Sequence, residues 1–173
     1  MKAVRSDSFC VNGGHKVTVQ GSPLRLVVFG IEGQRYALRL DTVERVLPMA
    51  AVSPLPKAPS VALGVINLHG QVVPVLDIRS RFSLPSCDYG ITGRLLVART
   101  HRRILALPVD EVVGVTEVAG DTVMPPGTVL PGIGYVAGIV ALADGLIFIH
   151  DLGTFLSLDE EQSLAEALEE RAG

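Results

Sequence analysis

The strongest constraint in this sequence is a pattern of short strands that occurs twice. Residues 24–82 and residues 92–156 each contain, in the same order, a hairpin, a single strand, a connection rich in proline and glycine, and a second hairpin. Matching segments of the two halves lie at a nearly constant offset along the chain. A repeat of whole strand patterns indicates duplication of one five-stranded unit.

The predicted strands are short, rich in aliphatic residues and separated by turn residues. Five short, strongly twisted strands tend to close into a small barrel. A unit of roughly 60 residues is only marginally stable alone, but 48% apolar residues allow two barrels to bury a face against each other. We therefore predict an all-β fold of two small five-stranded β-barrels packed on a shared core, with short helical turns and a short C-terminal helix. The predicted strands are 26–31, 35–40, 43–47, 62–68, 71–76, 94–99, 103–109, 112–118, 136–142 and 146–150.

The sequence divides into three parts. Residues 1–22 have no sustained periodicity and are expected to form a flexible N-terminal arm, with one short strand at 16–19. Residues 23–158 form the ordered domain, with subdomains at approximately 24–82 and 92–156 that could exchange strands. Residues 159–173 have leucines at helical spacing among many glutamates, which predicts an acidic C-terminal helix or tail.

The central hairpin of the first half spans residues 62–76. His69 and Gly70 form its turn, because glycine adopts the positive φ that such a turn requires. Asp77 follows the second strand and can accept the free amides of a helical turn. The proline-rich connection before this hairpin is expected to stay extended and outside the sheet ladders.

Composition argues against several functions. A net charge of −3 and only 5% aromatic residues do not fit a nucleic-acid partner. No apolar run reaches the length that direct membrane insertion needs. The first residues lack a signal-peptide core, so a cytoplasmic protein is expected, with Cys10 and Cys87 as free thiols.

Catalytic and metal-binding patterns are absent from the sequence. The four histidines are scattered, and none has a metal-ligand spacing with cysteine or a carboxylate. His150 beside Asp151 is best explained as a strand-end histidine next to a capping aspartate. We therefore expect a non-enzymatic protein without cofactor or metal. A small-molecule-binding or hydrolytic barrel is the alternative, and it would need a polar pocket with converging side chains.

Four stretches of this chain resemble the CheW-like family of chemotaxis coupling proteins. They are LRLVVFGIEGQRYALRLDTVERVL, LGVINLHGQVVPVLDIRSRF, LALPVDEVVGV and VAGIVALADGLIFIHDLGTFL, and the resemblance covers roughly residues 24–158. The second stretch is the most specific. Its residues that match the family pattern are Gly64, Val65, Asn67, Leu68, Gly70, Pro74, Asp77 and Arg79.

The resemblance implies an adaptor that couples chemoreceptors to a CheA-type histidine kinase in a bacterial chemosensory array. A variant of this hypothesis places the protein in a parallel pathway, such as surface or pilus motility. One surface would bind the regulatory domain of the kinase, and the groove between the barrels would bind the hairpin tip of a receptor. The resemblance implies cytoplasmic localisation with recruitment to membrane-attached arrays.

The resemblance also suggests site residues. Those of the receptor-binding groove are Val43, Arg45, His69, Gly70 and Arg94. Those of the kinase-binding surface are Leu63 and Gly64. Asn67, Pro74, Asp77 and Arg79 are assigned to the structural motif.

Two positions depart from the family pattern. His69 stands where the family has arginine, so a permanent charge is replaced by an imidazole, whose reference pKa is about 6.5. Pro108 stands where an aliphatic residue is usual, and because proline removes a ladder donor we expect it at a sheet edge or bulge.

Overall fold

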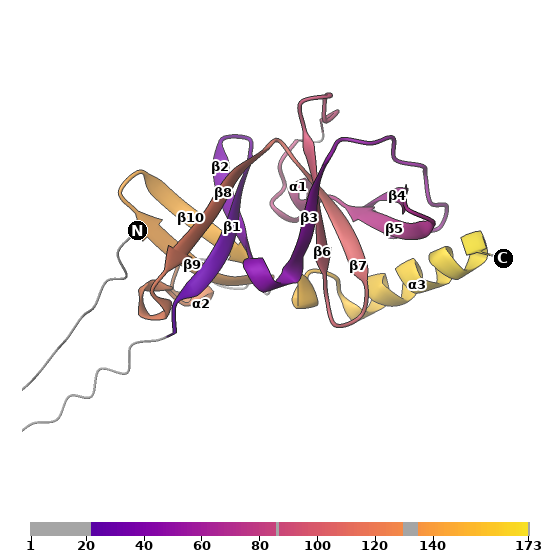
Figure 1. Cartoon of the computed structure of the whole chain (residues 1–173). Coiled ribbons are helices and arrows are strands. Elements are labelled where there is room, and N and C mark those ends of the chain that lie inside the picture. Colours follow the sequence, from indigo (N-terminus) through magenta and orange to yellow (C-terminus); the bar gives the residue numbers. More distant parts are fainter. Residues whose placement is uncertain (1–21, 86, 130–134, 173) are drawn as a thin grey trace, which may run out of the picture.

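The computed structural model describes residues 22–85, 87–129 and 135–172. Nearly all of the N-terminal arm, including the strand predicted at residues 16–19, lies outside these ranges. The described chain forms two five-stranded sheets with short helical elements, and the prediction of a mostly β fold with a short C-terminal helix is confirmed (Figure 1).

Both sheets draw strands from both halves of the sequence. Sheet A has, from edge to edge, β8 (Glu111–Val118), β1 (Leu24–Ile31), β2 (Gln34–Arg39), β10 (Gly145–His150) and β9 (Val136–Leu142). Sheet B has β3 (Val43–Pro48), β6 (Arg94–Arg99), β7 (Ile104–Val109), β5 (Gln71–Leu76) and β4 (Ala62–Leu68). The helical elements are α1 (Ile78–Arg81), α2 (Pro126–Val129), α3 (Leu158–Ala172), η1 (Leu40–Thr42), η2 (Gly120–Thr122) and η3 (Leu152–Thr154).

Parallel pairing joins the two halves within each sheet. β2 pairs with β10, and β5 pairs with β7, in parallel, whereas the other ladders are antiparallel. The expectation of closed barrels is wrong in one respect, because each sheet is open. Among the described strands, β8 and β9 are the edges of sheet A, and β3 and β4 are the edges of sheet B.

The proline-rich connections do join the ladders, at one point each. Ser53 exchanges two backbone hydrogen bonds of 2.8 Å with Val65, and Met124 exchanges equivalent bonds of 2.8 and 3.0 Å with Ile139. These bridges cover the edge strands β4 and β9 and correct the prediction that the connections stay outside the sheets. Gly64 permits the close approach, since a Cβ there would lie 2.2 Å from the Ser53 carbonyl oxygen.

Pro108 lies in an interior strand, not at an edge as predicted. β7 has β6 on one side and β5 on the other. The parallel ladder between β5 and β7 consists of the single pair Val75–Ala106. This ladder ends before position 108, so the missing amide of Pro108 costs it no hydrogen bond.

The sheets pack on a shared apolar core. Alternate residues of β1 point to opposite faces: Phe29 enters the shared core, whereas Val28 enters a separate core on the other face of sheet A. In β6, Leu96 enters the shared core and Leu95 the separate core of sheet B. Helix α3 contributes Leu164 and further apolar residues to the shared core. Both sheets therefore depend on the same buried interface.

A buried arginine connects the segments around this interface. Arg79 of α1 has a side chain only 1% exposed, and it forms ion pairs with Glu32 in the β1–β2 turn and with Asp110 between β7 and β8. Its Nε donates to the Tyr89 hydroxyl at 2.9 Å. Burial alone would lower the pKa of Arg79, but hydrogen bonds to Glu32 and Tyr89 and the charge of Asp110 raise it, so the guanidinium stays charged.

Asp77 and Asp151 cap helical turns as predicted. Asp77 Oδ1 accepts from the Arg79 amide at 3.0 Å, and Asp151 Oδ1 accepts from the Gly153 amide at 2.9 Å. Asp110 has a different role, because it accepts from Arg79 and from the Glu32 amide, at 2.9 and 2.8 Å.

His150 is buried in the shared core at 3% exposure. Its ring lies 5.3 Å from the rings of Tyr36 and Phe82 and 6.3 Å from those of Phe29 and Phe155. Neither ring nitrogen has a hydrogen-bond partner among the described residues. Burial lowers the pKa of His150 from 6.5 to about 4, so the imidazole is neutral at pH 7.

The first prediction concerns the central hairpin. Val65 is 2% exposed in the shared core, and Val65→Asp would bury an unpaired carboxylate. The cost is several kcal/mol, a large part of a typical domain stability of about 5–15 kcal/mol. Thermal unfolding followed by circular dichroism should lose its cooperative transition. Val72→Asp is the matched control, because Val72 is 47% exposed in the same hairpin and its variant should melt like the parent. A cooperative transition for Val65→Asp near that of the parent would contradict the assignment.

The second prediction concerns pH. The unfolded chain protonates His150 near pH 6.5 and the folded chain only near pH 4, so stability is lost as pH falls through this window. The loss from this group amounts to about 3 kcal/mol, at about 1.4 kcal/mol per pH unit. Urea unfolding of the parent and of His150→Phe at pH 7, 6, 5 and 4.5 measures it. The variant should lose less stability than the parent as pH falls, and equal losses would contradict the account.

Candidate functional site

Metal sites need clusters of ligating side chains. No group of three or more histidine, cysteine, aspartate or glutamate side chains in this part of the chain could hold a metal ion. No helix in the same residues is both long enough and apolar enough to cross a membrane. The functional features are therefore sought on the surface.

An apolar strip lies where the shared core reaches the surface at two edge strands. On β8, Val112 and Val115 lie opposite the buried residues Phe29 and Val27. Directly opposite residues share a sheet face, so these valines lie on the face that carries the shared core. On β3, Val43 and Val46 likewise lie opposite Ala98 and Leu96. The apolar strip is defined by Val43, Val46, Val112 and Val115.

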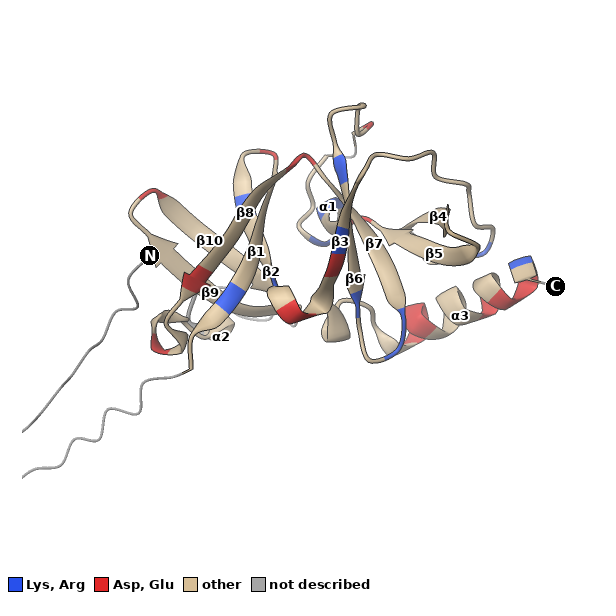
Figure 2. Ribbon diagram, viewed as in Figure 1, with Lys and Arg blue, Asp and Glu red and all other residues tan. Residues whose placement is uncertain are grey.

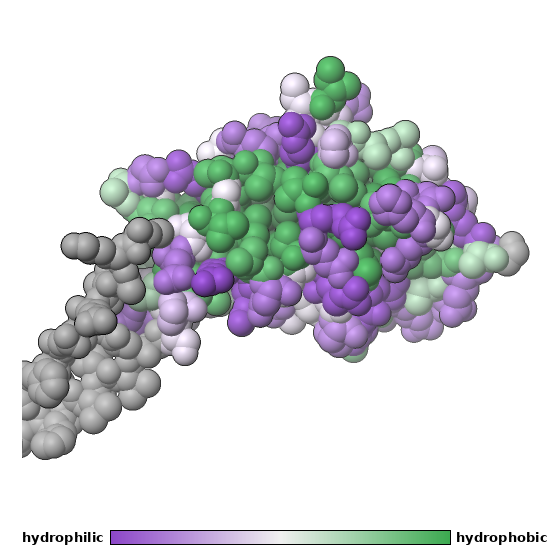
Figure 3. Space-filling view, viewed as in Figure 1, coloured by the Kyte–Doolittle hydropathy of each residue, from purple (hydrophilic) through white to green (hydrophobic). Residues whose placement is uncertain are grey.

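The strip remains accessible to a partner. Val115 is 61% exposed and Val46 is 41% exposed. Figure 3 shows apolar residues gathered on the face of the molecule that carries β1, β3 and β8. Exposed contiguous apolar surface of this kind usually marks an interaction site.

Charged residues border the strip on the β3 side (Figure 2). Arg45 is exposed and lies opposite Val97, so it points to the other face of sheet B from Val46. Arg94 lies opposite Pro48 at the end of β6 and donates to the Thr92 and Gly93 carbonyls, both at 3.0 Å.

A second exposed apolar surface lies on the hairpin of β4 and β5. Leu63 is 43% exposed and Val72 is 47% exposed. Gly64 is buried against the connection that carries Ser53. Its lack of a side chain is required by packing, because a Cβ would clash with the Ser53 backbone.

The turn of this hairpin has the geometry expected from the sequence. His69 and Gly70 both have positive φ, at 53° and 88°, as a tight two-residue hairpin turn requires. Asn67 fixes the turn, since its Oδ1 accepts from the Gly70 amide at 2.7 Å. His69 is exposed.

The strand order separates the residues suggested for the receptor groove into two sets. Val43, Arg45 and Arg94 lie on the neighbouring strands β3 and β6. His69 and Gly70 lie in the β4–β5 turn, and β4 is the opposite edge of sheet B.

The four residues that the resemblance assigned a structural role, Asn67, Pro74, Asp77 and Arg79, each have an identifiable one. Asp77 caps α1, Arg79 connects the two sheets, and Asn67 holds the turn. Pro74 is buried in β5 opposite Val65.

Comparison with known proteins identifies the family. A family model described as a CheW-like domain matches residues 25–160, most of this 173-residue chain. The chain belongs to the CheW-like family. The chemotaxis protein CheW of Rhizobium meliloti (strain 1021) is 24% identical over 140 residues, which are 80% of this chain and 90% of that protein. The chemotaxis protein CheW of Treponema pallidum (strain Nichols) is 26% identical over 156 residues, 86% of this chain and 91% of that protein.

A solved structure supports the same assignment. The crystal structure of the scaffolding protein TtCheW from Thermoanaerobacter tengcongensis matches with a TM-score of 0.73 and 26% sequence identity. The match covers 80% of this CheW-like chain and 95% of the other.

Sequence reasoning missed Val46, Val112 and Val115 as surface residues. A signal was present in residues 111–118, EVVGVTEV, which carry valines at both odd and even positions. A strand with one buried face needs apolar residues at only every second position. The extra valines could have indicated an edge strand with an exposed apolar side.

The third prediction distinguishes the two hairpin glycines of this CheW-like chain. Gly64→Ala should abolish or severely reduce stability, because its Cβ would lie 2.2 Å from a backbone oxygen. Gly70→Ala meets no atom within 4 Å and suffers only from its φ of +88°, a cost of about 1–2 kcal/mol. Urea unfolding of both variants checks this order. If Gly64→Ala and Gly70→Ala lowered the free energy of unfolding equally, the prediction would be contradicted, and the connection at Ser53 would be able to move away from the new side chain.

Proposed function

We propose that this CheW-like protein is a chemotaxis adaptor that holds a chemoreceptor and a CheA-type histidine kinase in one complex. The observation that carries the proposal is the pair of exposed apolar surfaces on different edge strands of one core, in a chain whose family includes chemotaxis and scaffolding proteins. Two separate surfaces allow two partners to bind at once. The function requires no catalysis and no cofactor.

The apolar strip is proposed as the receptor surface. A receptor hairpin tip presents helices, and an amphipathic helix docks with its apolar side on apolar residues of the partner. Val43, Val46, Val112 and Val115 provide such a contact area, and Arg94 provides donors for acidic or carbonyl groups at its border. Arg45 points to the other face of sheet B, so it would contact the receptor only around the edge of β3.

The hairpin of β4 and β5 is proposed as the kinase surface. Leu63 and Val72 would pack against an apolar edge of the regulatory domain. Gly64 would act indirectly, because the Ser53 bridge that it permits holds the hairpin in place.

His69 and Gly70 are proposed to contact the receptor on the family resemblance alone, because their turn lies at the other edge of sheet B from the strip. Imidazole at position 69 offers a partner two nitrogens in place of a permanently charged guanidinium. The receptor contact of this turn is therefore expected to differ from that made by family members with arginine.

Coupling follows from holding both partners on a rigid core. If the conformation of the receptor changes the geometry in which the kinase is held, the two kinase states are stabilised unequally and their populations shift. Simultaneous binding also raises the effective concentration of kinase at the receptor. The adaptor is thereby recruited to membrane-attached arrays from the cytoplasm.

The fourth prediction separates the two surfaces by mutation. Val46→Asp combined with Val115→Asp should weaken binding to the cytoplasmic hairpin fragment of the cognate receptor at least tenfold, equivalent to about 1.4 kcal/mol. Binding to the regulatory domain of the cognate kinase should be unchanged. Leu63→Asp combined with Val72→Asp should give the reverse pattern. All four side chains are exposed, so both variants should melt like the parent.

Titration calorimetry against each partner measures these affinities. Loss of both partners in both variants would indicate one shared surface and contradict the proposal. Unchanged binding of both partners in both variants would show that neither apolar surface is used.

A further inference from the structure

Edge strand β8 differs from the other three edges in having neither a backbone bridge nor a proline. Its ladder with β1 is interrupted by one β-bulge, opposite Val28 and Phe29. The edge of β4 is covered by the bridge to Ser53, and that of β9 by the bridge to Met124. β3 carries Glu44 and Arg45 and ends in Pro48, features that block pairing with a further strand. In the described part of the chain β8 pairs with β1 alone.

The middle of β8 is an apolar segment suited to pairing. Val113 is 55% exposed, Val115 is 61% exposed, and the charged residues Glu111 and Glu117 lie toward the ends. Gly114 has no atom within 4 Å of the position of a Cβ, so the surroundings of the strand are open at its centre. An exposed apolar edge strand invites pairing or aggregation unless something covers it.

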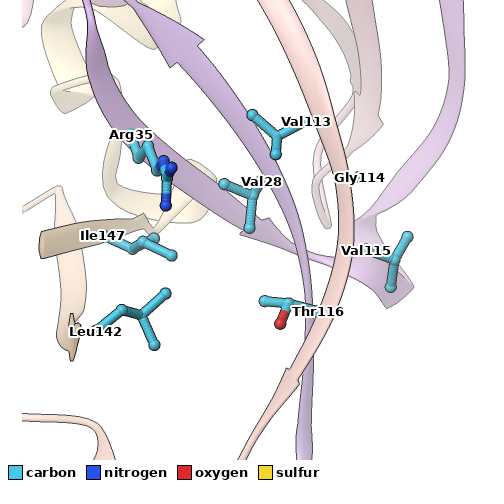
Figure 4. A pocket seen from close by; sticks show the side chains of 8 residues that line it. All are labelled: Val28, Arg35, Val113, Gly114, Val115, Thr116, Leu142 and Ile147. Carbon is cyan, nitrogen blue, oxygen red and sulfur yellow. The ribbon is translucent and has the colours of Figure 1, made fainter. Parts of the chain in front are cut away.

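Beside this edge lies a hollow of about 180 Å³ on the face of sheet A that carries Val28, opposite the shared core. Most of its lining is apolar and comes from β8, β1, β9 and β10, with Arg35 at one side. Figure 4 shows Val113, Val28, Ile147 and Leu142 around the hollow, whereas Val115 points away from it. Arg35 forms an ion pair with Asp144 at 2.6 Å. The hollow lies between β8 and the β9–β10 hairpin, and its lining suits apolar side chains.

We propose that residues 16–19, Lys-Val-Thr-Val, pair with the free edge of β8 as a sixth strand of sheet A, with Val17 and Val19 filling the hollow. These residues belong to the chain outside the described ranges. Alternation places Val17 and Val19 on one face and Lys16 and Thr18 on the other. The apolar face then meets the hollow, and the polar face meets solvent.

The length of the connection agrees with this placement. Leu24, at the start of β1, lies opposite Val118, at the end of β8. A strand on the far edge of β8 is two strand spacings from β1, about 10 Å. Five residue steps from Val19 to Leu24 span at most about 17 Å. Residues 16–19 therefore reach positions beside 114–118.

Charge favours the same partner. Residues 1–21 contain Lys2, Arg5 and Lys16 but a single acidic residue, Asp7. β8 contains Glu111 and Glu117 and no basic residue, and Glu117 already pairs with Arg25 of β1 at 3.5 Å. Glu111 is therefore the carboxylate of β8 that would attract the basic arm, most strongly at low ionic strength.

Amide hydrogen–deuterium exchange of the full chain tests the proposal. Amides of residues 16–19 should exchange at least tenfold more slowly than those of residues 2–9, at every protein concentration. Val17→Asp combined with Val19→Asp should remove this protection and raise exchange in residues 113–118 at least threefold. Val4→Asp combined with Val11→Asp is the matched control with the same added charge, and it should change neither segment.

Two results would overturn the proposal. Exchange of residues 16–19 as fast as that of residues 2–9, with no effect of the Val17/Val19 variant on β8, would show that the arm does not cover the edge. Protection of residues 113–118 that grows with protein concentration would show that a second copy of the chain covers it instead.

Discussion

The buried guanidinium of Arg79 is the interaction on which the arrangement of the two sheets depends. Arg79 lies in α1, directly after β5 of sheet B. It pairs with Glu32 in the β1–β2 turn of sheet A and with Asp110, which connects β7 of sheet B to β8 of sheet A. Its side chain is 1% exposed, so its charge needs these partners. Glu32 and Asp110 are 47% and 41% exposed, so they hold the buried guanidinium from the surface, and water lowers the strength of each pair. The network therefore ties α1 to the β1–β2 turn and to the connection between β7 and β8.

This rigid arrangement explains how a small β protein can serve as an adaptor. Each sheet contains strands from both halves of the chain, and both sheets bury side chains in the same core, so separating them would expose that core. The shared core reaches the surface at β3 and β8, and a separate apolar surface remains on the β4–β5 hairpin. Because both surfaces are built on one core, a partner bound at one has a fixed position relative to a partner bound at the other.

Local features of the fold could be predicted from the sequence. The strands, the turn at His69 and Gly70 and the cap at Asp77 follow from short-range periodicity and turn chemistry. The mixing of strands from both halves in each sheet could not be derived from the sequence. The two halves are similar, so a strand of one half could pair equally well with partners in either half. The pairing of Ser53 with Val65 contradicts the usual behaviour of proline-rich segments and depends on the glycine at position 64. The apolar strip was missed because it arises where strands from both sheets meet the surface. The site residues taken from the resemblance remain proposals.

The central claim is that this protein joins receptor and kinase simultaneously. Sedimentation of receptor-containing membranes with the soluble regulatory domain of the cognate kinase tests it most directly, with and without this protein. The account predicts that the kinase domain sediments with the membranes only when the protein is present, in an amount that rises until the protein saturates the receptors. Displacement of the protein from the membranes by increasing kinase domain would show that the two partners compete, and it would contradict the account.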